Sequence, residues 1–309
     1  MASQWRVVDL SSFEGEVRSE RGAVAIIPEG GERVVLPVAE LAVVLIGMKA
    51  AFTAAALHRL VQADVSVLLC DWRGVPEAGA YMWSDHGRVG ARHRAQAELS
   101  LPRKKNAWAR IVRAKIEGQA NALANLGYCG SGELFALADQ VRSGDPGNVE
   151  AQAARLYWSR AMDKGMGRQP SSGALLGSNA CLDYGYTVLR GYAMRAVLAA
   201  GLCSALGVFH HGRANMFALA DDLIEPFRPC VDEVALSLPS TASPSDPKVK
   251  RVLVSAAGQK FMKNGLGVAA VMEDLAQRYG RYVEGDEERL SVPVWEGPTT
   301  VSASSGYDG

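Results

Sequence analysis

A change in residue type near position 83 divides the sequence into two parts with different predicted structures. Before it, short β-branched runs such as WRVVDL and ERVVLPV are separated by Gly, Pro and Glu, the pattern of short strands. After it, helix-favouring Ala, Gln, Arg, Lys and Leu predominate from position 86 to about 126. The sequence therefore predicts an α+β fold, with a small β-rich domain at 1–83 and a larger α-helical domain at 84–296. The Gly/Ser/Thr-rich tail at 297–309 is expected to be disordered.

The spacing of apolar residues predicts further elements in both parts. In the first, FTAAALHRLVQAD has helical spacing and VSVLLCD is a short apolar strand. Two strongly apolar windows, 38–52 and 189–209, carry charged residues and are expected to be buried rather than to cross a membrane. In the second part, helices are predicted at 132–143, 148–163, 178–206, 214–224 and 247–281.

The cysteines and the N-terminus bear on the cellular compartment. The five cysteines are widely spaced and include no C-x-x-C pair, which argues against a zinc ribbon or a thioredoxin-like site. Reduced, buried thiols in a cytoplasmic protein are the interpretation that we favour. The N-terminus has no basic segment followed by an apolar stretch, so it does not predict a secretory signal.

Positive charge is concentrated in one segment of a chain whose formal net charge is zero. Residues 88–115 contain nine Lys and Arg and a single acid, Glu98. A local excess of this size suits a phosphate backbone, because each neutralised phosphate releases counterions. The alternative interpretation is a solvent-exposed helix face whose charged side chains have scattered ion-pair partners. The side chains predicted to contact DNA are Arg88, Arg92, Arg94, Arg103, Lys104, Lys105, Arg110 and Arg113.

Three acids lie close together in the largely apolar segment NMFALADDLIEPFRP, where Pro226 is expected to end a helix. Asp222 lies three positions before Glu225 and Asp221 lies four before it, so either aspartate can share a helix face with Glu225. Acids held this close in an apolar segment need a cation or raised pKa values. An acidic helix end that faces water is the alternative, but acids at that end oppose the helix dipole.

Two further segments offer side chains that can bind a metal. Glu150 lies in the first turn of a predicted helix, where neighbouring alanines leave space beside its carboxylate. His210 and His211 follow an apolar stretch in LGVFHHG, and two adjacent histidines cannot both face one point on regular structure. The alternative for Glu150 is a surface residue that the helix dipole stabilises. The alternative for the two histidines is a pair of polar loop residues. Carboxylates together with imidazole suit Mg²⁺ or Mn²⁺ better than zinc.

Several motifs together resemble the family of CRISPR-associated spacer-acquisition integrases. The run ADDLIEPFRP, preceded by LGVFHHG, resembles the metal site of that family, and NVEAQAARLYW resembles the segment with its first glutamate. SNACLDYGYTVLRGY resembles the family's helix with the signature N-x-x-L-x-Y-G-Y, and CDWRGVPEAG in the β-rich part is also similar. The resemblance covers residues 1 to about 295, and the form I-E-P-F-R-P favours the group found with single-effector systems.

The resemblance implies a set of site residues. His210 is preferred to His211, because Gly207 and His210 match the family spacing G-x-x-H. The implied catalytic and metal-binding residues are Glu150, His210 and Glu225. Residues implied to support these ligands, or to serve as alternatives, are Asp222, His211 and Arg228.

The resemblance also implies a fold, an activity and partners. A small β domain forms a homodimer, a helical domain carries the site, and two dimers flank a dimer of a small second subunit. The implied enzyme uses Mg²⁺ or Mn²⁺ as cofactor and inserts short double-stranded DNA fragments into a CRISPR array, by attack of a 3′-hydroxyl on a phosphodiester at the repeat border. This transesterification needs no ATP, in agreement with the lack of a G-x-x-x-x-G-K-[ST] loop.

Three other functions remain open from the sequence. A structure-selective nuclease without an integrase role would use the same ligands. A non-catalytic DNA-binding scaffold would use its acids only to cap helices. A metal-dependent hydrolase of small molecules is the third, and the basic segment argues against it.

Overall fold

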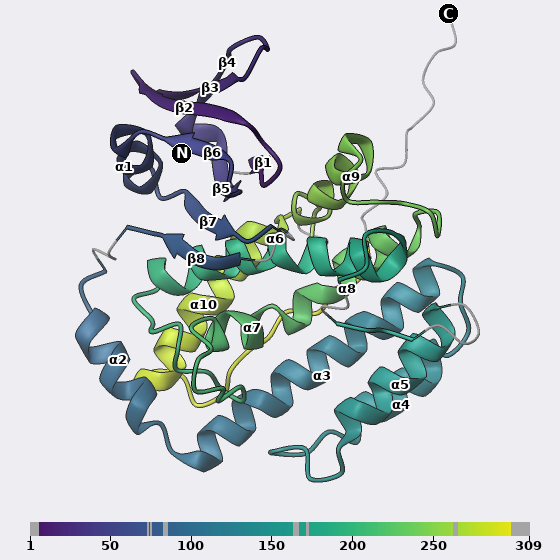
Figure 1. Ribbon diagram of the computed structural model, residues 1–309. Coiled ribbons are helices and arrows are strands. Elements are labelled where there is room, and N and C mark those ends of the chain that lie inside the picture. Colours follow the sequence, from purple (N-terminus) through teal and green to yellow (C-terminus); the bar gives the residue numbers. More distant parts are fainter. Residues whose placement is uncertain are drawn as a thin grey trace, which may run out of the picture.

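The computed structural model describes residues 6–72, 74, 76–82, 86–162, 167–170, 173–261 and 265–297. Within them a region of strands is followed by a helical region, which confirms the predicted α+β fold (Figure 1). The domain boundary predicted at position 83 falls outside the described residues. So does the tail for which we predict disorder, apart from Gly297.

The strands of the first region form two sheets among the described residues. One has the order β1-β5-β7-β8, in which only β8 runs antiparallel to its neighbour. The other has the order β4-β3-β2-β6, and the predicted run GEVRSERGAVAII forms its hairpin of β2 and β3. The strands are β1 (Arg6–Leu10), β2 (Gly15–Glu20), β3 (Ala23–Pro28), β4 (Val34–Pro37), β5 (Leu41–Ile46), β6 (Ala50–Phe52), β7 (Ser66–Cys70) and β8 (Pro76–Ala80).

Helix α1 (Ala54–Gln62) is set among these strands, as predicted. It begins after Thr53, whose side-chain oxygen accepts a hydrogen bond of 3.2 Å from the amide of Ala56. This cap satisfies one of the free amides of the first turn. The buried side chains of α1 then pack into the core of the β domain.

The strand β5 is buried along its whole length because it contributes to both cores. Val44 and Ile46 belong to the core of the β domain, whereas Val43 and Leu45 belong to the core of the helical domain. Side chains alternate between the faces of a strand, so a run such as LAVVLI is apolar on both sides. Helix α6 (Gly177–Ala199) lies so close that a Cβ at Gly191 would come within 2.8 Å of Val43.

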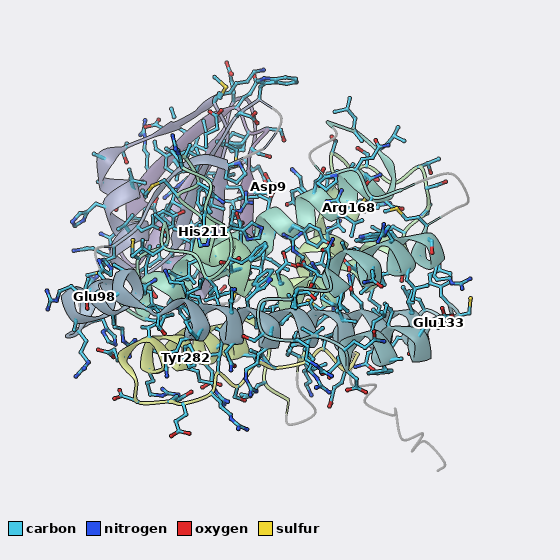
Figure 2. All side chains as sticks on the ribbon, turned by 90° about the horizontal axis from the view of Figure 1, so that it is seen from below. Asp9, Glu98, Glu133, Arg168, His211 and Tyr282 are labelled. Carbon is cyan, nitrogen blue, oxygen red and sulfur yellow. The ribbon has the colours of Figure 1, made fainter. Side chains whose placement is uncertain are left out.

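Polar contacts also join the two regions. Asp9 of β1 lies at the border with the helical domain (Figure 2), where it accepts a hydrogen bond of 2.7 Å from the hydroxyl of Tyr184. The ammonium of Lys250 lies 2.8 Å from the same carboxylate oxygen. Together with β5, these contacts fix the β domain against the helices that carry the site.

Two long helices, α3 and α6, organise the helical region (Figure 1). Helix α3 contacts α4, α5 and α8, while α6 contacts α7, α8, α9 and α10. The helices are α2 (Val89–Glu98), α3 (Leu101–Asn125), α4 (Ser131–Ala138), α5 (Val149–Ala161), α6 (Gly177–Ala199), α7 (Ala218–Leu223), α8 (Arg228–Leu236), α9 (Pro247–Ala257) and α10 (Val268–Glu284), with 3-10 turns η1 (Val38–Glu40) and η2 (Glu225–Phe227).

Several predicted helices have different bounds in the structure, and three of them differ most. The helical segment from position 86 to about 126 consists of α2 and α3, with Pro102 in the first turn of α3, where its missing N–H needs no partner. The helix predicted at 178–206 ends at Ala199, because Gly201 adopts a φ of +62° and closes the helix end. The helix predicted at 247–281 consists of α9 and α10, which a glycine-containing segment separates.

Helix α8 is absent from the sequence prediction. Pro226 was expected to end a helix, and α7 does end before it, at Leu223. The chain then makes the turn η2 and starts α8 at Arg228. A proline ends one helix but is equally compatible with the first turn of the next, so the pattern alone does not separate the two cases.

The structure also bears on the cysteines and on the apolar windows. The five cysteines, all in described residues, form no disulfide, and Cys70, Cys181 and Cys230 are buried as predicted. Cys129 is exposed, contrary to the prediction of buried thiols. Among the described residues, no helix is long and apolar enough to span a membrane.

Candidate metal centre

Glu150 and Glu225 meet at the side chain of Lys115. The ammonium of Lys115 lies 2.8 Å from Oε1 of Glu150 and 2.7 Å from Oε2 of Glu225. Lys115 comes from α3, Glu150 from the first turn of α5, and Glu225 from the start of η2. The two glutamates that the sequence predicts for one site therefore lie together, with the last lysine of the basic segment between them.

The charges at this point are largely shielded from water. The side chains of Lys115 and Glu225 are 14% and 5% exposed. Burial acts to raise the pKa of Glu225, but Arg228 and Lys115 outweigh it, so the pKa of this carboxyl is lowered. Burial also disfavours the charged form of Lys115, but Glu225 and Glu150 raise its pKa. Both groups are therefore charged near neutral pH, and Oε2 of Glu225 is held by charge without the geometry of a hydrogen bond.

Asp145 sets the start of α5 and thereby the position of Glu150. Its carboxylate accepts hydrogen bonds of 2.9 Å from the amides of Val149 and Glu150. These amides belong to the first helical turn, whose N–H groups have no partner within the helix. Asp145 is not among the residues predicted from the sequence; an acid shortly before a helix start is the signal that could have found it.

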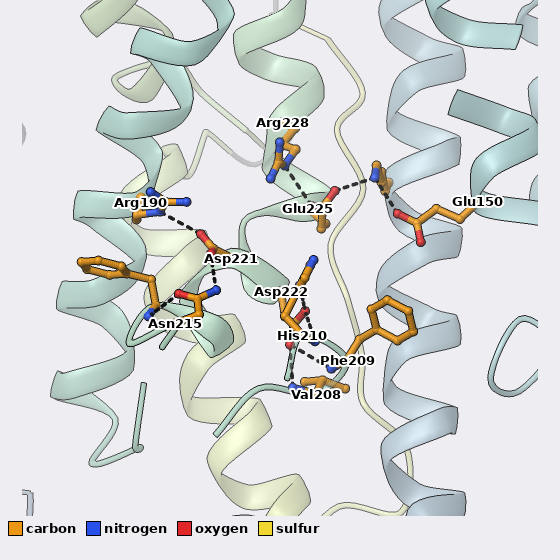
Figure 3. A network of polar contacts seen from close by, with 12 residues as sticks. Glu150, Arg190, Val208, Phe209, His210, Asn215, Asp221, Asp222, Glu225 and Arg228 are labelled. Atoms are coloured by element: carbon orange, nitrogen blue, oxygen red, sulfur yellow. Dashed lines mark hydrogen bonds and ion pairs between the residues drawn. The ribbon is translucent and has the colours of Figure 1, made fainter. Parts of the chain in front are cut away.

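Asp222 holds the loop that carries His210. Its Oδ2 accepts hydrogen bonds from the amides of Val208 at 2.6 Å and Phe209 at 3.0 Å (Figure 3). Its Oδ1 lies 2.5 Å from Nδ1 of His210. This bond engages Nδ1 and leaves Nε2 as the ring atom for another partner, an arrangement typical of metal-binding histidines. The hydrogen bond with Asp222 is the main reason why the pKa of His210 is raised.

The loop before His210 has little room for larger side chains. A Cβ at Gly207 would come within 2.5 Å of the carbonyl oxygen of His210 and 2.9 Å of Oδ2 of Asp222. The ring of Phe209 stacks on Trp108 of α3, with centroids 4.4 Å apart and an angle of 5° between the planes. The spacing G-x-x-H thus has a physical basis, because the loop folds tightly around Asp222 and against α3.

Two other candidates have different surroundings. Asp221 lies 2.8 Å from Nε of Arg190 and accepts a hydrogen bond of 3.0 Å from Asn215, so it holds α6 and the loop before α7 (Figure 3). His211 is exposed, whereas His210 is partly buried beside Asp222. The two adjacent acids therefore have different contacts, and the two adjacent histidines have different exposure. The sequence did not separate the members of each pair until the family resemblance was considered.

Arg228 connects Glu225 to a buried network. Its Nε lies 3.0 Å from Oε1 of Glu225, and its guanidinium lies 4.5 Å from the centroid of the Tyr186 ring. The hydroxyls of Tyr186 and Tyr157 both donate to Asp232, which burial gives a raised pKa of about 6. These residues come from α8, α6 and α5, so the network links three helices around the glutamates. Tyr157 and Asp232 are not among the residues predicted from the sequence, and their pattern carries no distinct signal.

The basic segment contains side chains that the structure turns inward. Arg92 is buried, and its guanidinium contacts Glu284, Gln277 and the carbonyl of Ala200. Arg103 donates to the carbonyl of Tyr282 in the last turn of α10 and to that of Glu287 beyond the helix. Both therefore hold α2 and α3 against the rest of the helical domain. The prediction that Arg92 faces DNA does not agree with this placement, because charge count along a chain does not show which side chains are buried.

The other predicted DNA contacts lie at or near the surface. Arg88 lies 2.7 Å from Glu284, and Arg113 lies 2.6 Å from Asp139. The pair of Arg113 and Asp139 is exposed on both sides and contributes little stability, so Arg113 can exchange its partner. Arg88 is itself exposed, although its partner Glu284 is largely buried. The exposed members of the set are Arg88, Arg94, Lys105 and Arg113, and the partly exposed ones are Lys104 and Arg110.

In the part of the chain that the structure describes, no three His, Cys, Asp or Glu side chains converge closely enough to hold a metal ion. Two of the implied ligands, Glu150 and Glu225, nevertheless share Lys115, and the charge of the third, His210, acts on Glu225. The donor types suit a hard divalent cation, and the ammonium of Lys115 already provides positive charge between two of them.

Comparison with known proteins decides the family. The family model described as CRISPR associated protein Cas1 matches residues 10–260. This chain belongs to the Cas1 family. A relative from Neisseria meningitidis serogroup C, named CRISPR-associated endonuclease Cas1, is 35% identical over 215 residues, which are 69% of each chain. The resemblance inferred from the motifs is therefore confirmed.

Solved structures share the fold. A casposase bound to an integration product superposes with a TM-score of 0.76 at 18% identity, over 92% of each chain. A chain of a Cas6-RT-Cas1–Cas2 complex gives a TM-score of 0.71 at 17% identity, over 95% of this chain and 36% of that one. At these identities the likeness shows that this member of the Cas1 family has the fold of known relatives.

Proposed function

We propose that this member of the Cas1 family is an integrase dependent on Mg²⁺ or Mn²⁺ that joins short DNA fragments to a CRISPR repeat. The 3′ oxygen of the fragment forms a bond to phosphorus at the repeat border. The bond from phosphorus to the 3′ oxygen of the target strand breaks, and the proton of the attacking hydroxyl ends on that leaving oxygen. The number of phosphodiester bonds is unchanged, so no nucleotide cofactor is required.

One observation carries this proposal: two glutamates from different elements converge on a positive charge beside a histidine whose Nδ1 is fixed. The residues fit a hard divalent cation, since Oε2 of Glu225 is buried without a hydrogen bond and Nε2 of His210 remains for a ligand. Glu150, His210 and Glu225 would hold the ion. When bound, it polarises the scissile phosphate and lowers the pKa of the attacking hydroxyl.

The surrounding residues keep this arrangement ready. Asp222 orients the imidazole of His210, and Arg228 keeps Glu225 ionised although it is buried. Asp145 fixes the turn that presents Glu150. A prearranged set of charged groups needs little reorganisation during the reaction, which is how enzymes stabilise a developing negative charge.

DNA and protein partners belong to the same proposal. The exposed members of the basic segment contact phosphates and position the DNA without reading its sequence. The β domain binds a second copy of the chain, and the dimers bind a small second subunit. The fold shared with a casposase bound to an integration product and with a chain of a Cas6-RT-Cas1–Cas2 complex supports the DNA and the second subunit as partners.

A strand-transfer assay tests the function. It uses supercoiled plasmid with a CRISPR repeat, a short labelled DNA duplex, the second subunit and Mn²⁺. We expect the wild type to join label to plasmid, and Glu150→Ala and His210→Ala to bind DNA without joining it. Joining by either variant would contradict the proposed site. Nicking without joining by the wild type would favour a structure-selective nuclease, and DNA binding without any reaction would favour a scaffold.

A further inference from the structure

We propose that Lys115 is an internal cation that takes the place of the divalent ion in the metal-free protein and gives up Glu150 and Glu225 when the ion binds. This inference rests on the metal site proposed above. It concerns the order of events at that site: the protein exchanges one cation for another instead of filling an empty position.

The first argument is geometric. One nitrogen, Nζ of Lys115, lies within 3 Å of a carboxylate oxygen of each glutamate. An ion that takes both oxygens as ligands must occupy the region where this ammonium lies. The presence of the ammonium also agrees with the finding that no three metal-binding side chains converge in the described residues. The lysine and the ion therefore compete for the same two oxygens.

The second argument concerns charge. Two carboxylates held together away from water repel each other unless a cation lies between them. In the metal-free protein, Lys115 and Arg228 balance the charges of Glu150 and Glu225. A divalent ion that replaces Lys115 between the glutamates leaves an excess of positive charge, which suits an incoming phosphodiester. Lys115 thus preserves the carboxylate pair until the ion and the DNA arrive.

The third argument distinguishes this lysine from an ordinary ion pair. Glu225 also has Arg228 against its other oxygen, so it keeps one cationic partner when Lys115 withdraws. The flexible stem of Lys115 starts from α3 and can withdraw without moving the backbone of that helix. A charge with a rigid planar group would be harder to displace.

Mn²⁺ binding measures the competition directly. The amount of free Mn²⁺ is followed by electron paramagnetic resonance while full-length wild type, Lys115→Met and Lys248→Met are titrated without DNA. Lys248 is exposed on α9, so its variant is a control for the loss of one positive charge. We expect Lys115→Met to bind Mn²⁺ at least about tenfold more tightly than the wild type does, because the competing charge is removed. The control should match the wild type.

A second measurement needs no variant and covers the case that Lys115→Met does not fold. Wild-type protein is treated briefly with an amine-modifying reagent, with and without Mg²⁺, and modified lysines are located by mass spectrometry. The buried ammonium of Lys115 should react slowly without metal and several-fold faster with it, while Lys248 should be unaffected.

The outcomes separate this inference from the proposed function. Equal or weaker Mn²⁺ binding by Lys115→Met, with binding by the wild type intact, would overturn the exchange and leave the metal site standing. Unchanged modification of Lys115 under conditions where the metal binds would do the same. Binding of Mn²⁺ by neither protein would remove the metal site itself, and the exchange with it.

Discussion

Nδ1 of His210 lies 2.5 Å from Oδ1 of Asp222, a carboxylate that also accepts hydrogen bonds from the amides of Val208 and Phe209. One buried aspartate thus fixes both the ring of His210 and the loop that carries it. We infer that Asp222 positions His210, because its bond to Nδ1 leaves Nε2 as the ring nitrogen for another partner.

Replacing Asp222 with asparagine should therefore impair the site without removing a proposed ligand. The hydrogen bond with Asp222 raises the pKa of His210, so Asp222→Asn should lower that pKa in the metal-free protein, as measured by NMR titration. The buried amides lose a charged acceptor, which should cost about 1–3 kcal/mol of unfolding free energy. Strand transfer should fall at least tenfold. A His210 pKa that stays at its wild-type value would contradict this function of Asp222.

Gly207 should be as necessary as the ligands, for a steric reason. A Cβ there would come within 2.5 Å of the carbonyl oxygen of His210, which no ordinary contact allows. We expect Gly207→Ala to displace the loop and reduce strand transfer at least tenfold, with DNA affinity unchanged. Gly212→Ala is the matched control in the same loop, because its Cβ would meet Asn215 at an ordinary 3.4 Å. Similar activity of the two variants would show that the loop tolerates the change.

Asp232 should make stability depend on pH in an identifiable way. Burial raises its pKa from 3.8 to about 6, so the folded state binds this proton more tightly than the unfolded state does. The contribution of Asp232 to stability is therefore greatest below pH 4, and it is lost as pH rises through 6. The loss is about 3 kcal/mol, since each pKa unit corresponds to about 1.4 kcal/mol.

Asp232→Asn removes this proton equilibrium. Urea unfolding of wild type and variant should therefore show a difference in free energy that moves in favour of the variant between pH 4.5 and pH 7.5. The variant also loses an acceptor for Tyr157 and Tyr186, which gives a constant penalty at every pH. A difference that is the same at both pH values would mean that Asp232 keeps an ordinary pKa.

The sequence predicted the order of the two regions because composition and periodicity are local properties. Burial of the apolar window at 38–52 was predicted for the same reason, whereas its folding into the strand β5 was not. The segments that carry Glu150, His210 and Glu225 were found through motifs. The bridge made by Lys115 was not, because it joins residues 35 and more positions apart on three elements. No spacing within one segment encodes such a contact.

Pairs of neighbouring residues also have contacts that their sequence spacing does not predict. Asp221 and Asp222 are adjacent, but one contacts Arg190 and the other His210. Which acid faces the site depends on the packing of α6 and of the His210 loop around α7. The predicted helix ends were wrong where a single residue determines them. Gly201 is an example, because its positive φ ends α6 within an otherwise helical run.

Arg92 and Arg94 provide the sharpest test of the DNA surface, because they are two residues apart on α2 and have opposite environments. Arg94 is exposed, whereas Arg92 is buried against Glu284, with side-chain exposures of 5% and 6%. We expect Arg94→Glu to weaken DNA binding and to reduce the slope of log affinity against log salt by about one. Fluorescence anisotropy between about 50 and 200 mM salt measures both.

Arg92→Met should act on folding instead. It leaves Glu284 without its buried partner and the carbonyl of Ala200 without its donor, which should cost at least about 2 kcal/mol of unfolding free energy. The folded fraction should still bind DNA with the wild-type salt slope, since Arg92 does not reach the surface. A reduced slope for Arg92→Met at unchanged stability would place Arg92 on the DNA surface and reverse the assignment of the two arginines.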